Sequence, residues 1–328
     1  VAGLLVLMRS RPRRLGLATA LIALLVTLDL LHFAVGYQPI GPAFRIVPAR
    51  TPAIAYLERH RDAGRISGVQ VVAADWLTLH GLRDVRGADE PLPTRRFFRL
   101  WQVMEATAEP PAPDELSELT PQVLGLLGAR FVLLPPQAQT AIPALRPVYR
   151  GADATIVENA LAAPRAFVPA EVHVLPGARA EYATIGERRF DPRRHATLRA
   201  GEVRGLAPAA GAPGTARVID EANASVTLRA TLAQRGLVVL DDTWGPGWSV
   251  EVDGRPARAL QTNAVLRGVV VPAGTHEVRW RYRVPGLRLG ALLSAAGLLA
   301  ALAWAGVLLA RSRCSGALSR RAARSRGL

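Results

Sequence analysis

Two long apolar segments bordered by arginines constrain this chain more than any other feature of its sequence. The first runs from Leu15 to Tyr37 with Asp29 as its one charged residue, and the second runs from Leu289 to Ala310 without a charge. The hydrocarbon core of a bilayer is about 30 Å thick and needs roughly 20 apolar residues of helix. We therefore predict two transmembrane helices, over residues 15–37 and 287–310.

The basic residues predict how these helices are oriented. Every basic side chain apart from histidine is an arginine, and two clusters border the apolar segments: Arg9, Arg11, Arg13 and Arg14 before the first, and Arg311, Arg313, Arg320, Arg321, Arg324 and Arg326 after the second. The positive-inside rule places both clusters in the cytosol. The central region is then extracytoplasmic, in a multi-pass protein of a bacterial cytoplasmic membrane.

The N-terminal end has an alternative interpretation. A signal peptide starting at Met8 would also have an arginine-rich start, but the apolar run is long for such a peptide and no clear Ala-x-Ala site follows. Residues 1–14 read instead as the end of a preceding span and a cytosolic arginine loop. The chain is then the C-terminal piece of a longer polytopic protein.

Composition excludes several classes of function. The net charge of +15 lies largely beside the apolar segments, which argues against a nucleic-acid-binding face. Cys314 is the one cysteine, so the chain forms no internal disulfide framework. We find no zinc spacing, glycine-rich phosphate loop or nucleophile elbow, and we predict no metal and no cofactor.

Residues 38–204 mix helical and strand patterns and predict an α/β layer. Helices are expected over Pro52–Arg61, with Thr51 as N-cap, and over Thr120–Leu127. Strands are expected over Arg65–Ala73 and Arg130–Leu134. The proline-rich stretch 107–115 is a predicted loop.

Residues 205–216 form a predicted linker, and residues 217–284 read as strands throughout. The expected strands are Ser225–Leu232, Gly236–Leu240, Trp248–Val252, Pro256–Leu260, Leu266–Val271 and His276–Tyr282. Asp253-Gly254 is a strong two-residue hairpin signal, and Pro272–Thr275 is a second turn. Short, regularly spaced strands indicate a β-sandwich. The predicted fold is thus α+β and membrane-anchored: two transmembrane helices flank an α/β layer and an all-β sandwich, and residues 311–328 form a basic cytosolic tail.

Several motifs in order resemble the YfhO-like bacterial membrane proteins. The C-terminal ones are Leu237–Trp248, Val250–Gly254 and Asn263–His276, and the earlier ones are Asp84–Gly87, Leu126–Leu133, Tyr149, Glu158-Asn159, Pro164–Phe167 and Phe190–Pro192. The resemblance covers nearly the whole chain. Such proteins are similar to GT-C type glycosyltransferases, which implies sugar transfer from polyprenyl-phosphate carriers to cell-envelope polymers. The acidic catalytic residue of that class lies in the first outer loop, near the N-terminus, and no such loop is present in this chain.

Candidate contacts for a lipid carrier or substrate fall at two places. Asp29 and His32 share one helical face of the first apolar segment, where ionisable residues are costly and often functional. The alternative is that they reach the headgroups or face another span. Asp84, Arg86 and Asp89 surround Gly87 in a polar turn, and an arginine there suits a glycan or phosphate. The alternative is a salt-bridged surface loop.

Trp244 and Trp248 flank Gly245–Gly247 and are candidates for contact with a glycan or with lipid headgroups. Packing of Trp248 into the sandwich core is the alternative. Asp241, Asp242 and Asp253 are too few and too scattered to predict a calcium site. The sequence therefore predicts an envelope region that supports lipid-linked sugar transfer; the alternative is a non-enzymatic module that binds glycan or the membrane surface. The expected partners are membrane lipids, a polyprenyl-phosphate sugar and cell-envelope glycan.

Overall fold

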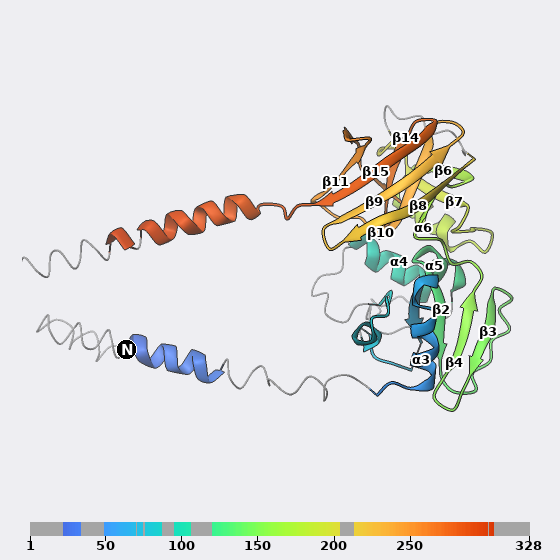
Figure 1. Cartoon of the computed structure of the whole chain (residues 1–328), viewed down its shortest axis with the longest axis horizontal. Helices are drawn as coiled ribbons and strands as arrows, with labels where there is room; N and C mark the ends of the chain where they lie inside the picture. The colour runs from blue at the N-terminus through green and yellow to red at the C-terminus, as the bar shows by residue number, and fades with distance from the viewer. Residues whose placement is uncertain are drawn as a thin grey trace, which may run out of the picture. The chain divides into compact units, whose positions relative to one another are not determined.

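The computed structural model describes residues 22–33, 49–69, 71–74, 76–86, 95–105, 120–203, 213–300 and 302–304. The chain divides into two compact units, residues 1–50 and residues 51–328. The described part of the first unit is mainly the exposed helix Ile22–Phe33. The second unit contains the sheets (Figure 1).

The second unit opens with a four-stranded mixed sheet, and its strand order is β1-β2-β4-β3. The strands are β1 (Arg65–Gly68), β2 (Ala129–Leu134), β3 (Leu145–Arg150) and β4 (Thr155–Asn159). β1 runs parallel to β2, and the other two pairs are antiparallel. Helix α3 (Pro52–Arg59) precedes the sheet and starts as predicted, since the Thr51 hydroxyl accepts a hydrogen bond from the Ile54 N–H.

Strand β2 is apolar from Phe131 to Leu134 because both of its faces are buried there. Phe131 and Leu133 pack with α3, whereas Val132 and Leu134 join the larger core on the other side. Successive side chains of a strand point to opposite faces, so a strand between two layers has no polar side.

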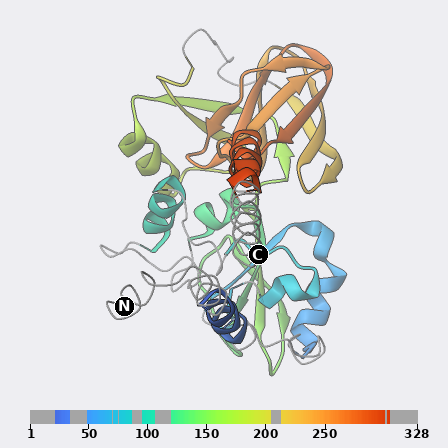
Figure 2. The same cartoon turned by 90° about the vertical axis from the view of Figure 1, so that its left-hand side faces the viewer.

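A helical layer lies between the mixed sheet and the rest of the unit (Figures 1 and 2). It contains α4 (Arg95–Glu105), α5 (Pro121–Leu126) and α6 (Ala178–Gly186). The short helices η2 (Arg61–Ala63) and η3 (Trp76–His80) follow α3 in the chain, and Leu77 of η3 packs with α3 on the other face of the mixed sheet. α6 connects the parallel strands β6 (Glu171–Leu175) and β7 (His195–Arg199). Neither this β-α-β segment nor α4 is predicted from the sequence.

Two further sheets pack as a sandwich. One has the order β13-β14-β10-β5 and the other β12-β11-β15-β9-β8. Their strands are β5 (Ala166–Phe167), β8 (Gly214–Ala222), β9 (Ser225–Leu232), β10 (Gly236–Thr243), β11 (Trp248–Val252), β12 (Arg255–Ala257), β13 (Leu260–Thr262), β14 (Leu266–Val271) and β15 (Gly274–Tyr282). Leu228, Leu240, Val269 and Trp280 lie in the shared core between the sheets.

Strand β10 is the centre of the unit. Val238 and Leu240 face the sandwich core, whereas Leu237 and Val239 face the core that contains α4 and α5. The β10 sheet is therefore a middle layer, covered by a second sheet on one face and by helices on the other. This double burial explains the unbroken apolar run Gly236–Leu240.

The predicted hairpin at Asp253-Gly254 is confirmed. Val252 pairs with Arg255, and both turn residues have positive φ, 50° at Asp253 and 75° at Gly254. This combination is that of a type I′ turn. The Asp253 carboxylate also lies 2.6 Å from His276 Nδ1 and accepts the Glu277 N–H, so the hairpin is tied to β15.

Other predicted elements differ from the structure. β1 is shorter than the strand predicted over Arg65–Ala73. The strand predicted over Pro256–Leu260 breaks after Ala257, because β12 and β13 belong to different sheets. Pro272–Thr275 likewise carries the chain from one sheet to the other instead of closing a hairpin. β5 joins the sandwich although it precedes the predicted linker. Residues 205–212 of that linker lie outside the described residues, as does the loop 107–115.

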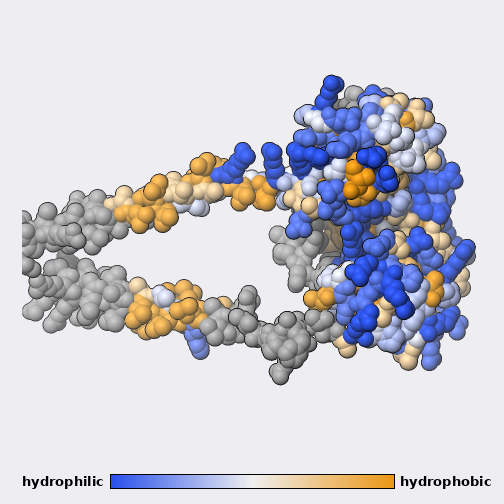
Figure 3. Space-filling view, viewed as in Figure 1, coloured by the Kyte–Doolittle hydropathy of each residue, from blue (hydrophilic) through white to orange (hydrophobic). Residues whose placement is uncertain are grey.

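One described helix is long and apolar enough to cross a membrane. It covers Leu287–Trp304 and has a mean hydropathy of 1.7, and none of its described residues is buried in the protein. Figure 3 shows its described residues largely in orange. Ile22–Phe33, the described part of the first predicted span, is a shorter apolar helix. Residues 15–21 and 34–37 of the first predicted span lie outside the described residues, as do residues 305–310 of the second, residues 1–14 and residues 311–328.

Candidate functional site

Asp241 is a buried carboxylate at the junction of the middle sheet and the mixed sheet. It follows Leu237 and Val239 in the alternation of β10, so its side chain continues the face that packs toward the helices and β1. The side chain is 2% exposed, and its Oδ1 accepts a hydrogen bond from Arg65 Nη1 at 2.8 Å. Arg65, the first residue of β1, also donates to the backbone carbonyl of Asp241 and to Asp242 Oδ1.

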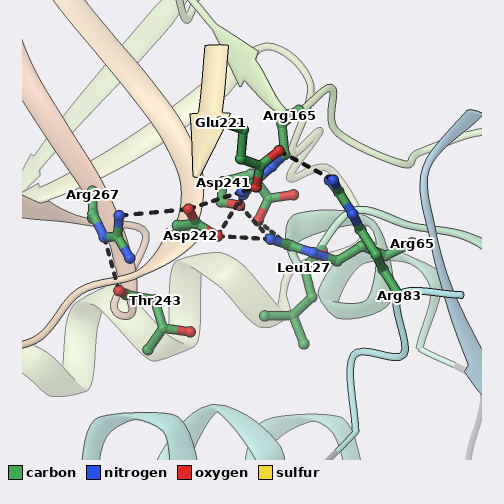
Figure 4. Close-up of polar contacts among 9 residues, drawn as sticks. All are labelled: Arg65, Arg83, Leu127, Arg165, Glu221, Asp241, Asp242, Thr243 and Arg267. Carbon is green, nitrogen blue, oxygen red and sulfur yellow. Dashed lines mark hydrogen bonds and ion pairs between the residues drawn. The ribbon is translucent and has the colours of Figure 1, made fainter. Parts of the chain in front are cut away.

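Arg165 extends this cluster toward strand β8. It donates to the Asp241 carbonyl and to both oxygens of Asp242, and its Nη2 lies 2.7 Å from Glu221 Oε1. Arg83 donates to the other Glu221 oxygen at 3.1 Å. Figure 4 shows these side chains converging from separate elements on the end of β10. We call Arg65, Arg83, Arg165, Glu221, Asp241, Asp242 and Arg267 the junction network.

Burial and neighbouring charges shift several pKa values in the junction network. Burial raises the pKa of Asp241 to about 6, although Arg65 and Arg165 oppose the shift. Burial also raises the pKa of Glu221, but Arg165 and Arg83 outweigh it, so the net shift is downward. Burial lowers the pKa of Arg267 to about 10, with Asp242 opposing, and Arg267 therefore stays charged at neutral pH. A perturbed carboxylate beside a cavity is a mark of functional sites.

A cavity of about 470 Å³ opens beside Asp241. Its charged lining comes from Arg61, Asp62, Arg65, Arg83, Arg165, Glu221 and Asp241, and three glycines, Gly64, Gly81 and Gly128, complete part of the wall. Gly128 has φ of 72°, and a Cβ there would lie 2.3 Å from Asp241 Oδ2. Glycine is therefore required where the turn after α5 passes the carboxylate.

The structure places Asp84 and Arg86 inside the protein. Arg86 donates through Nε and Nη2 to the two Asp84 oxygens at 3.2 and 2.8 Å, and through Nη1 to the Val72 carbonyl. The two side chains are 2% and 0% exposed, for Arg86 and Asp84 respectively. They hold the turn against β1 instead of facing solvent. The alternative of a salt-bridged surface loop is therefore wrong about exposure, because the ion pair is present but buried. Asp89 lies outside the described residues.

Trp248 packs against the sandwich core and is covered on one face. The guanidinium carbon of Arg267 lies 3.4 Å from the centroid of its ring, and the Tyr282 ring lies 5.2 Å away. This contact agrees with the packing alternative for Trp248. Trp244 is half-buried, and its backbone N–H donates to the Val265 carbonyl.

Asp29 and His32 both lie on the exposed helix Ile22–Phe33 of the first unit. Their spacing of three residues along that helix agrees with a shared face.

A second polar group, which the sequence analysis did not single out, is formed by Glu171, His173 and His195 on β6 and β7. Their ligand-type atoms lie within 4.8 Å of one another. However, His195 Nδ1 accepts the Asp191 N–H at 3.1 Å, which puts the proton of a neutral ring on Nε2, the atom 3.5 Å from Glu171. In a histidine that binds a metal, one ring nitrogen binds the metal and the other ring nitrogen donates a hydrogen bond, so the arrangement is the opposite one. This tautomer disfavours metal binding.

Most of the junction network is not predicted from the sequence. Asp241 and Asp242 were considered only as calcium ligands, and Arg65, Arg165 and Glu221 were not singled out. A signal for Asp241 exists, since a carboxylate directly continues the buried apolar run of β10. Its partners come from positions far apart in the chain.

Comparison with known proteins gives no relative for this chain. No protein-family model, no curated protein and no solved structure matches it. The resemblance to YfhO-like proteins therefore remains a prediction from the ordered motifs.

Proposed function

We propose that this chain is the membrane-anchored, extracytoplasmic part of a YfhO-like protein and supports lipid-linked sugar transfer to cell-envelope polymers. The observation that carries the proposal is the continuity of β15 with the apolar helix. Only Arg283–Gly286 separate Tyr282 from Leu287, so the sandwich lies close to whatever surrounds the helix.

The helix needs an apolar environment. Its leucines are largely uncovered, for example Leu289 at 63% and Leu292 at 69% exposure. Burial of one leucine side chain is worth about 1.5–3 kcal/mol, so a row of uncovered leucines strongly favours transfer from water to lipid. The six arginines after the helix favour a cytosolic C-terminus and an outer location for the sheets.

The alternative function is a non-enzymatic envelope module that binds glycan or the membrane surface. The arginine-lined cavity favours a binding role within either function, because it offers charged donors at the surface of the outer region. The two functions differ in whether a parent protein with further spans transfers sugar.

Location and function are tested separately. Reporter fusions after Leu328 and near Gly211 should give cytosolic and extracytoplasmic signals; the same compartment for both would contradict the topology. For function, residues 51–284 are deleted in the encoding bacterium, and the sugar content of envelope polymers is measured. Loss of sugar with the truncated protein still in the membrane supports the transfer role. An unchanged sugar content would favour the binding module.

Asp29 gives a finer test of the transfer role. Asp29→Asn in the full-length parent should reduce transfer more than Trp244→Ala does, if Asp29 lines the carrier site. The 328-residue chain alone should be inactive with polyprenyl-phosphate sugars. Turnover by this chain alone would contradict the view that the catalytic part lies in other spans.

A further inference from the structure

We propose that the cavity beside Asp241 is a binding site for an oxyanion, a phosphate or carboxylate group carried by a larger molecule. The proposal goes beyond the function above and does not depend on sugar transfer. Its basis is the arrangement of arginine donors around an open volume at the junction of two layers.

Two arginines at the cavity have donors to spare. Arg61 donates through Nε to the Glu58 carbonyl at 3.2 Å, and its two Nη groups have no acceptor among the residues that the structure describes. Arg83 is 58% exposed and bonds to Glu221 through one nitrogen, Nη2. A guanidinium offers five N–H donors in a planar fork that matches an oxyanion. These two side chains can therefore contact a ligand without breaking the junction network.

The charge balance around the cavity favours an anion. The junction network together with Arg61 and Asp62 of the cavity lining contains five arginines and four carboxylates. One of the carboxylates, Asp241, has a pKa near the range of mildly acidic media. The local charge is therefore positive at neutral pH and becomes more positive when Asp241 binds a proton.

One buried donor lacks an acceptor. Arg165 Nε is enclosed and has no hydrogen-bond partner in the described structure, although the rest of its guanidinium is fully engaged. An enclosed N–H without an acceptor is costly and points to a missing acceptor atom. Arg165 lines the cavity, but this atom is enclosed, so it meets an oxyanion bound there only if the arginine side chain shifts.

The size of the cavity indicates more than an isolated ion. A volume of about 470 Å³ is in the range of small-molecule sites, so the charged group arrives with a body such as a sugar or glycerol unit. Gly81 lines the space, and a Cβ built on it meets no atom within 4 Å. This position provides a place to add a side chain toward the ligand without steric conflict.

A matched pair at Gly81 tests the proposal. Gly81 has φ of 69°, a conformation that Asp and Asn tolerate better than other residues, so both substitutions carry similar strain. The full chain in nanodiscs of neutral phospholipid is titrated calorimetrically with inorganic sulfate, which keeps its charge across the pH range used. Gly81→Asp should weaken sulfate binding about tenfold relative to Gly81→Asn, because it adds a like charge beside the anion.

A second pair separates the cavity from general surface charge. Arg61→Gln removes a charge at the cavity, and Arg229→Gln removes one from an exposed position on β9. Arg61→Gln should weaken sulfate binding several-fold, whereas Arg229→Gln should leave it within twofold. Absence of sulfate binding by the unmodified chain, or equal losses in both variants, would overturn the proposal. Thermal unfolding of each variant confirms that a loss of binding is not a loss of fold.

The lipid composition then identifies the source of the anion. If a lipid headgroup occupies the cavity, nanodiscs that contain phosphatidylglycerol should weaken sulfate binding of the unmodified chain by competition, and Gly81→Asp should show less competition. If the anion belongs to a soluble or polymeric molecule, the affinity for sulfate should not change with the lipid. Both results support an oxyanion site and assign its ligand.

Discussion

The carboxylate of Asp241 accepts a hydrogen bond from Arg65 across 2.8 Å and so joins the end of β10 in the sandwich to the start of β1 in the mixed sheet. These residues lie 176 positions apart in the chain. The contact connects the layers at the edge of the cavity, and it makes the stability of the junction depend on one titratable group.

That group predicts an unusual pH dependence. The pKa of Asp241 is about 6 in the folded protein, compared with 3.8 for an aspartate in water. Because the folded pKa is raised, the contribution of this group to stability is fully present below about pH 4 and is lost as the pH rises through 6. The loss is roughly 3 kcal/mol at most. Asp241→Asn should remove it, so the variant should gain roughly 2 kcal/mol relative to the unmodified chain between pH 4.5 and pH 7.5.

Chemical denaturation of both proteins at the two pH values measures this difference. Arg65, Arg165 and Asp242 are the charged groups that act on Asp241, and both proteins retain all three. A stability difference that is the same at both pH values would contradict the raised pKa.

Gly128 and Gly254 should respond differently to alanine. Both have positive φ, 72° and 75°, so each substitution carries backbone strain of about 1–2 kcal/mol. At Gly254 a Cβ meets no atom within 4 Å, whereas at Gly128 it would lie 2.3 Å from Asp241 Oδ2. Gly128→Ala should therefore lower the free energy of unfolding by at least about 2 kcal/mol more than Gly254→Ala. Equal denaturation midpoints would show that Asp241 does not approach the turn.

The buried pair Asp84–Arg86 should matter far more than an exposed pair. Asp84→Asn leaves Arg86 enclosed without its counter-charge, and we expect a destabilisation of about 3–5 kcal/mol. The control is Arg130→Gln, which breaks the exposed pair with Glu158 and should cost at most about 1 kcal/mol. Urea denaturation of both variants measures the difference. A small effect of Asp84→Asn would mean that the pair is exposed to solvent and not buried.

The stacking of Arg267 on Trp248 predicts an energetic coupling. Lysine at position 267 keeps the charge but loses the flat contact and the hydrogen bond from Nε to the Thr243 carbonyl. A double-mutant cycle with Arg267→Lys and Trp248→Leu should give a coupling of about 1 kcal/mol. Additive effects of the two substitutions on stability would mean that the ring and the guanidinium do not stabilise each other.

Local chemistry in the sequence determined several elements of this fold. Thr51-Pro52 starts α3, Asp253-Gly254 forms the two-residue hairpin, and the alternation of Ser225–Leu232 gives β9 at its predicted bounds. Each of these depends on residues that are neighbours in the chain: a capping hydroxyl, two residues that accept positive φ, or a period of two. Such signals can be recognised within a few neighbouring residues of the sequence.

Only the tertiary structure decided which strands share a sheet and which charges meet. β14 and β15 are adjacent in sequence yet lie in different sheets, and β5 joins β10 from far upstream. Arg65, Arg165, Glu221 and Asp241 look like unrelated surface charges in the sequence, and they meet because three layers close on the end of β10. Burial then raises the pKa of Asp241, since desolvation depends on what surrounds a carboxylate in space and not on its neighbours along the chain.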